Sequence, residues 1–151
     1  MVRLCKTAGF ADPREVTRMP VVINHAKLRE AAGAARFSSV TYRCFKLTSL
    51  EPGQEDYGQI ATYLGTLPGA VAAYTLDRWH TLPAQEAVAV CGNTAAILSE
   101  SWLRVHFAVA GDRAEHRGSF RLDAAKDNDG DDELSLAGAM MCANGVCTLA
   151  N

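Results

Sequence analysis

The sequence contains no apolar run that approaches the roughly 20 consecutive residues needed to cross a membrane. Its first residues also show no basic segment followed by an apolar stretch and a cleavage site, so a secretory leader is not expected. We therefore expect a cytoplasmic protein without a membrane partner.

Clusters of basic residues are missing as well. The net charge is -2, yet six acidic residues lie between positions 123 and 133, where Lys126 is the single base. Without this stretch the 15 basic and 17 acidic residues become 14 and 11, so the rest of the chain is weakly positive. A weak and dispersed positive charge gives no reason to expect a nucleic-acid partner. The acidic stretch is too polar to bury a surface, which predicts a linker.

The cysteine content argues against a disulfide framework. Five cysteines are an odd number, and the chain shows no leader, so we expect reduced thiols. An isolated free cysteine is most often a small buried apolar residue. We therefore expect each cysteine that stands alone in an apolar segment to be buried. The five are Cys5, Cys44, Cys91, Cys142 and Cys147.

A glycine-rich cofactor turn is absent too. None of the 12 glycines belongs to a G-x-G-x-x-G turn between a strand and a helix, so the sequence predicts no dinucleotide-type cofactor site. What remains is an ordinary globular composition. A chain of 151 residues, 48% of them hydrophobic, is long enough for one domain with a core.

Local patterns predict short strands and helices that alternate along the chain. Their connections are too short for parallel crossovers, which favours antiparallel pairing. The expected fold class is α+β, with a mainly antiparallel sheet, helices packed on it, an acidic linker and a flexible tail that contains cysteines. Three helices are predicted. The first covers residues 1–8 and ends at Gly9, and the second covers residues 25–32, with Asn24 as its N-terminal cap and Gly33 at its end. The third begins at Gly92, with Asn93 or Thr94 as its cap, and continues through Trp102 and Leu103. Strands are predicted at residues 16–23, 37–47, 57–64, 71–76, 87–90 and 105–109, with a further candidate at 118–122.

The strands at 37–47 and 57–64 are expected to form one long hairpin around a wide polar loop at 49–56. As domains we expect a body at residues 1–122, the acidic linker at 123–133 and a tail at 134–151. The tail contains a C-x4-C pair, Cys142 and Cys147, around an Asn-Gly turn signal.

Four segments together carry a resemblance to a known family. They are residues 9–14 (GFADPR), 42–47 (YRCFKL), 55–66 (EDYGQIATYLGT) and 90–98 (VCGNTAAIL). Their order and spacing resemble the C-terminal, arsenic-handling half of arsenite S-adenosylmethyltransferases, over about residues 3–120. The resemblance implies an α+β domain that holds trivalent arsenic on cysteine thiolates. In that family this domain follows one that binds S-adenosylmethionine.

The resemblance also implies what this chain does not supply. The donor-binding part lies outside the similarity, so we expect no cofactor on this chain alone, although S-adenosylmethionine is implied for full-length members. A family cysteine normally falls in the loop before or within residues 55–59, where this chain has Gln54 and Gly58. Neither of these two residues is a ligand for arsenic.

Three thiols are therefore the candidate metalloid ligands: Cys44, Cys142 and Cys147. Thiolates suit soft ions, and we extend that preference to trivalent arsenic. The alternatives are that Cys44 packs within the sheet and that the tail thiols are incidental. For Cys91 a structural role is favoured.

Other polar residues give weaker signals. His80 and His106 show no catalytic partner at a recognisable spacing. Glu55 and Asp56 are expected to serve in capping or turn formation, because adjacent residues of a strand point to opposite faces.

Three functions remain open from the sequence. The first is the substrate half of an arsenite methyltransferase, truncated or split, and inactive without a donor-binding domain supplied in trans. Its ligand would be trivalent arsenic or an arsenic–thiol conjugate. The second is a stand-alone module that binds arsenite or another soft ion through thiols. The third is a remnant without a ligand.

Overall fold

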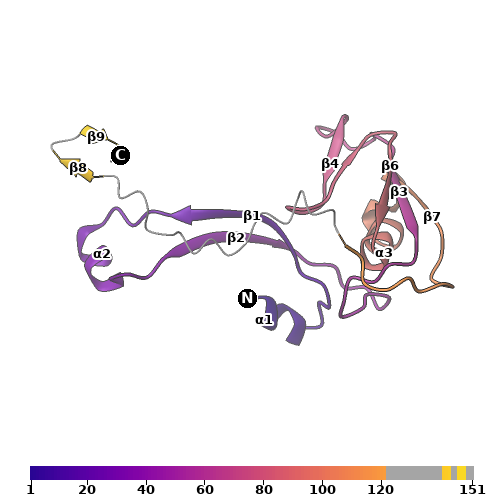
Figure 1. Cartoon of the computed structure of the whole chain (residues 1–151), viewed down its shortest axis with the longest axis horizontal. Coiled ribbons are helices and arrows are strands. Elements are labelled where there is room, and N and C mark those ends of the chain that lie inside the picture. The colour runs from indigo at the N-terminus through magenta and orange to yellow at the C-terminus, as the bar shows by residue number, and fades with distance from the viewer. Residues whose placement is uncertain (122–140, 144–145, 149–151) are drawn as a thin grey trace. The chain divides into compact units, whose positions relative to one another are not determined.

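The computed structural model describes residues 1–121, 141–143 and 146–148, and the chain divides into two units, Met1–Arg121 and Leu122–Asn151 (Figure 1). Every ladder between the described strands is antiparallel, and helices accompany the sheets. These observations confirm the α+β class. Among the described residues, no helix combines the length and apolarity that crossing a bilayer requires.

The first helix, α1 (Val2–Thr7), ends where the sequence predicts. Gly9 adopts a positive φ of 88°, which a residue with a Cβ rarely accepts. The Gly9 N–H donates to the Lys6 carbonyl and the Phe10 N–H donates to the Cys5 carbonyl, both at 3.0 Å. This pair of bonds is a Schellman cap. It turns the chain sharply after the helix.

The next three elements form a long hairpin: β1 (Arg14–Val21), α2 (Ala26–Ala32) and β2 (Phe37–Arg43). Figure 1 shows α2 at the far end of this hairpin. The two strands pair from Arg14 opposite Arg43 to Val21 opposite Phe37. Gly33 closes α2 as predicted, but Asn24 does not cap it, because His25 holds the N-cap position without a side-chain bond.

The predicted hairpin between residues 37–47 and 57–64 is wrong. Strand β3 (Gln59–Tyr63) instead lies in the centre of a three-stranded sheet, between β6 (Ala87–Val90) and β7 (Phe107–Ala110). Ala61 and Tyr63 are fully buried, whereas most of β2 is exposed. Burial of the apolar face of β3 under α3 therefore removes more apolar surface from water than pairing with β2 would.

Helix α3 (Gly92–Glu100) packs on this three-stranded sheet and supplies much of the core. Ile97, Leu98 and Leu103 are fully buried, but Trp102 is 60% exposed. The prediction that Trp102 covers the sheet is wrong because α3 ends at Glu100. A 3-10 helix (η1, Trp102–His106) follows, and it does not continue the α-helical period.

A small hairpin of β4 (Ala73–Thr75) and β5 (Thr81–Pro83) lies beside the core. Tyr74 of β4 packs against the rings of Tyr63 and Phe107, at ring-centroid distances of 6.0 and 5.6 Å. The sequence pattern missed β5. At the candidate strand 118–122, the described residues form no strand but a single β-bridge between Glu55 and Ser119.

The second unit contains two short strands, β8 (Met141–Ala143) and β9 (Val146–Thr148). They pair antiparallel, with Cys142 opposite Cys147 in the register. The predicted linker at 123–133 lies outside the described residues.

Candidate functional site

The predicted ligand Cys44 lies one residue beyond β2 and is half-buried. Cys5 of α1 is also half-buried, and it lies near enough to influence the Cys44 thiol. Burial raises the pKa of the Cys44 thiol, and the hydrogen bond and charge of Cys5 raise it further.

Cys5 is the site residue that the sequence did not reveal. Cys5 and Cys44 are 39 positions apart, and nothing in their local patterns connects them. The one related signal is Gly9, whose cap turns the chain back after α1. A Cβ added at Gly9 would lie 3.8 Å from Cε of Lys46, which places the cap beside the segment that follows β2.

The loop that holds Gln54 and Gly58 is fastened to residues 117–120. The Gln54 carbonyl accepts the Phe120 N–H at 2.8 Å, and the Asp56 carbonyl accepts the Arg117 N–H at 2.7 Å. Gly58 has a φ of 67°, and a Cβ there would meet the Arg117 guanidinium at 2.0 Å. A side chain at position 58 would therefore have to displace Arg117.

The acidic residues of this loop have structural partners. Asp56 accepts the Gly58 N–H at 2.7 Å, which confirms its predicted role in a turn. Glu55 instead pairs with Nε2 of His116 at 2.9 Å. The Tyr57 hydroxyl donates to Glu51 at 2.8 Å. These acids tie loops together, and we assign them no catalytic role.

Cys91, and not Asn93 or Thr94, is the N-cap of α3. Its Sγ accepts the Thr94 N–H at 3.4 Å and lies 3.9 Å from Nη2 of Arg14. Asn93 instead bonds across to Glu51, through contacts of 2.8 and 2.9 Å. Cys91 is fully buried, so its contacts fit the structural role that the sequence favours.

A buried ion cluster fixes the start of β1 to the turn between β4 and β5. Arg14 pairs with Asp12 at 2.7 Å and with Asp77 at 3.0 Å, and His80 Nδ1 lies 2.7 Å from Asp77. Arg14 and Asp77 are 3% and 0% exposed. Burial alone would raise the pKa of Asp77, but the bonds and charges of His80 and Arg14 outweigh it and lower that pKa. His80 thus has a carboxylate partner three residues away.

The described residues contain no group of three or more potential metal ligands. The predicted ligand Cys44 is therefore not part of such a group. The tail pair, Cys142 and Cys147, is brought together in register at the level of the backbone. Its role as a ligand pair stays a prediction.

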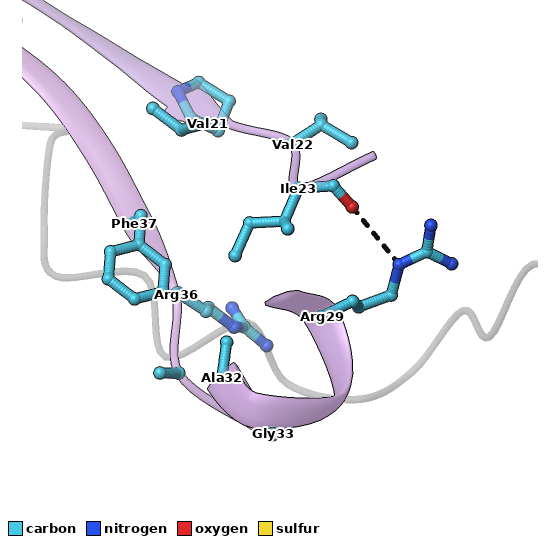
Figure 2. Close-up of a pocket in the computed structure, with 10 residues that line it drawn as sticks. Val21, Val22, Ile23, Arg29, Ala32, Gly33, Arg36 and Phe37 are labelled. Carbon is cyan, nitrogen blue, oxygen red and sulfur yellow. Dashed lines mark hydrogen bonds between the residues drawn. The ribbon is translucent and has the colours of Figure 1, made fainter. Parts of the chain in front are cut away.

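A shallow hollow of about 510 Å³ lies at the other end of the hairpin, between α2 and the ends of β1 and β2 (Figure 2). Its wall is mainly apolar, with Val21, Val22 and Phe37, and Arg29 donates to the Ile23 carbonyl at 3.2 Å. No cysteine lines it, so it is no candidate for a thiophilic ligand.

Comparison with known proteins finds clear relatives, although no family model matches the chain. The arsenite methyltransferase of Aquipseudomonas alcaligenes is 44% identical over 117 residues, which cover 78% of this chain and 34% of that protein. The arsenite methyltransferase of Mus musculus is 34% identical over 98 residues, covering 65% of this chain and 25% of that protein.

A solved structure matches the fold as well as the sequence. The crystal structure of an arsenic(III) S-adenosylmethionine methyltransferase from Chlamydomonas reinhardtii superimposes with a TM-score of 0.76 at 45% sequence identity. The match covers 80% of this chain and 40% of that one. The chain spans about a third or less of the length of the curated relatives that it matches. The chain is therefore similar to one part of the arsenite methyltransferases.

Proposed function

We propose that this chain is the substrate part of an arsenite methyltransferase and that trivalent arsenic, free or as a thiol conjugate, is its ligand. The similarity to arsenite methyltransferases over most of the chain carries the proposal. The free, half-buried thiols of Cys5 and Cys44 are compatible with it, because soft thiolate ligands suit a soft metalloid.

The methyl donor would come from another domain. All the described strand ladders are antiparallel, so residues 1–121 contain no parallel doubly wound sheet of the kind that binds nucleotide-type cofactors. We expect S-adenosylmethionine to be held by a donor-binding domain, in the same enzyme or in trans. The arsenic lone pair would attack the sulfonium methyl group in line, and the two domains would contribute proximity and alignment.

Exposed apolar side chains on α1 support the idea of a covering domain. No residue of α1 is buried, and Val2 and Leu4 are 40% and 65% exposed. A contact surface on α1 would bury these side chains. A donor-binding domain that covers α1 would also lie next to Cys5.

The test is a reconstitution. The chain is mixed with arsenite, glutathione and S-adenosylmethionine, with and without the separately expressed donor-binding domain of a relative. Methylated arsenic is measured by chromatography coupled to mass spectrometry. We expect product only when both parts are present. Product from the chain alone would contradict the missing donor site, and no product with both parts present would contradict the proposed function.

A second candidate is a stand-alone thiol module that sequesters arsenite or another soft ion. The backbone register that places Cys142 opposite Cys147 favours it, because thiolates suit soft ions. Changing both residues to serine should then abolish arsenite binding measured by calorimetry. Unchanged affinity would remove this candidate. The cytoplasmic setting and the absence of a nucleic-acid partner stay predictions from the sequence.

A further inference from the structure

We propose that the open face of the three-stranded sheet is a docking surface for an amphipathic helix of the donor-binding domain. The open face is the side of β6, β3 and β7 that α3 does not cover. The inference rests on the proposed function, because that function requires a second domain in the same enzyme or in trans.

The two faces of the sheet follow from the alternation of side chains along its strands. On the covered face, the register places Ala61 of β3 between Val88 of β6 and Val109 of β7. Ala61 is fully buried, and the two valines pack against the core. This face therefore has its partner, which is α3.

The open face is apolar, uncharged and made mostly of small side chains. Across β6, β3 and β7 its two rows are Ala89–Ile60–Ala110 and Ala87–Thr62–Ala108. Ile60 is 42% exposed, and the four alanines are exposed as well. Six neighbouring positions thus present a single polar side chain, that of Thr62, and no charge to the surroundings.

Such a composition is unusual for a sheet face that meets water. An antiparallel sheet with one solvated face normally alternates apolar residues on the inside with polar residues on the outside. Alanine is also depleted in strands, so strand formation does not explain the four alanines of β6 and β7. Small apolar side chains instead allow a second layer to pack closely on the sheet, as α3 does on the other face.

The size of the open face selects the kind of occupant. Three strands about 4.8 Å apart and four residues long cover roughly 14 by 14 Å. A helix is about 10–12 Å wide and rises about 1.5 Å per residue, so one helix of about nine residues spans this area. The nine residues of α3 span the opposite face in the same way. Two copies of the chain packed through this face would each contribute only roughly 200 Å² of footprint, whereas stable interfaces between separate proteins bury about 1,200–2,000 Å² in total.

A helix that belongs to the same enzyme does not need so large an interface, because covalent linkage gives it a high effective concentration. The chain spans about a third or less of the length of the curated relatives that it matches, so the rest of such an enzyme can supply the helix. The side of the helix that meets Ile60 would be apolar, since a charge buried there would find no partner on the sheet. We therefore assign the occupant to the donor-binding domain and not to a second copy.

Hydroxyl-radical oxidation of side chains, measured by mass spectrometry, tests the face without mutation. The full chain is compared alone and after fusion of the donor-binding domain of a relative in front of Met1. Ile60 should be oxidised readily in the chain alone and should lose most of this reactivity in the fusion. Trp102 of η1, 60% exposed and outside the open face, should react equally in both. Equal oxidation of Ile60 in both proteins, or protection of Ile60 in the chain alone, would overturn the inference.

Matched lysine substitutions in the fusion test the contact itself. Ala108→Lys places a charge on the open face, and Ala114→Lys makes the same change at an exposed alanine outside it. Ala108→Lys should restore the oxidation of Ile60 to the rate of the chain alone, and Ala114→Lys should leave Ile60 protected. Full protection in Ala108→Lys, or equal loss of protection in Ala114→Lys, would refute the docking surface. If Ala108→Lys lowers the urea midpoint of the chain alone, Ala89→Lys on the other outer strand repeats the test.

Methylation of arsenite by the same fusion separates this inference from the proposed function. Protection of Ile60 without methylated arsenic would leave the docking surface intact and refute the proposed function. Methylated arsenic with Ile60 as reactive as in the chain alone would refute the docking surface and leave the proposed function intact.

Discussion

The buried cluster around Asp77 allows the strongest stability prediction. In Asp77→Asn the side chain keeps its shape and its acceptor for the N–H groups of Trp79 and His80, both at 2.9 Å, but loses its charge. Arg14, 3% exposed, then has Asp12 as its remaining carboxylate. Removing one partner of a buried ion pair typically costs about 3–5 kcal/mol. Because Asp12 stays in place, we expect the lower end, about 3 kcal/mol.

Asp77→Ala should cost more, because it also leaves two backbone N–H groups without their acceptor, at roughly 1 kcal/mol each. The assay is urea unfolding at pH 7, followed by circular dichroism and tryptophan fluorescence. A domain of this size is stable by about 5–15 kcal/mol, so both losses lie well within the range of measurement. Glu100→Gln is the control, since its bond to Ser49 is exposed and its loss should cost less than about 0.5 kcal/mol.

The pH dependence provides an independent check of the same reasoning. The pKa of Asp77 is lowered in the folded protein, so its contribution is present at neutral pH and is lost as the pH falls below the carboxyl's ordinary range. In Asp77→Asn the free energy of unfolding should therefore decrease less, as the pH falls, than in the unchanged protein. A stability within about 0.5 kcal/mol of the unchanged protein at pH 7 would refute the assignment of Asp77 as the centre of this cluster.

Four further predictions concern other parts of the first unit. Hydrogen bonds from Arg18 are the main cause that lowers the pKa of Glu15 to about 2. The free energy of unfolding that Glu15 contributes is therefore lost between about pH 4.5 and 2, and Glu15→Gln should reduce this loss in acid-unfolding measurements. Gly9→Ala should cost roughly 1–2 kcal/mol in urea unfolding because of its positive φ; no cost would contradict the cap. Cys5→Ala should speed alkylation of Cys44 at pH 8, since it removes a neighbouring group that raises the pKa of the Cys44 thiol; an unchanged rate would refute this influence. Leu4→Ser should weaken association with the separately expressed donor-binding domain in ultracentrifugation, and equal association would exclude α1 as the contact surface.

Features that depend on neighbouring residues could be predicted from the sequence. Gly9 ends α1 because only a residue without a Cβ readily takes the positive φ that the cap requires. A glycine directly after a short helical segment is visible in the sequence without any knowledge of distant contacts. The strand at residues 87–90 also lies where alternation predicts it. The antiparallel α+β class followed from the short connections alone.

Features that depend on distant packing could not be predicted. The sequence gives β2 and β3 similar strand signals, but the burial of Ala61 and Tyr63 assigns β3 to the other sheet. The same limit applies to the candidate site. Cys44 stood out through its resemblance segment, whereas Cys5 became relevant only because it lies near enough to influence the Cys44 thiol.

The shortness of α1 has a consequence for detecting ligands. Six residues are too few to hold a helix in water by themselves, and none of them is buried. The order of α1 therefore depends on the residues or partners that pack against it. Any ligand or partner that packs on this turn would hold it in place, so slower amide deuteration of residues 2–7 would report binding without a label.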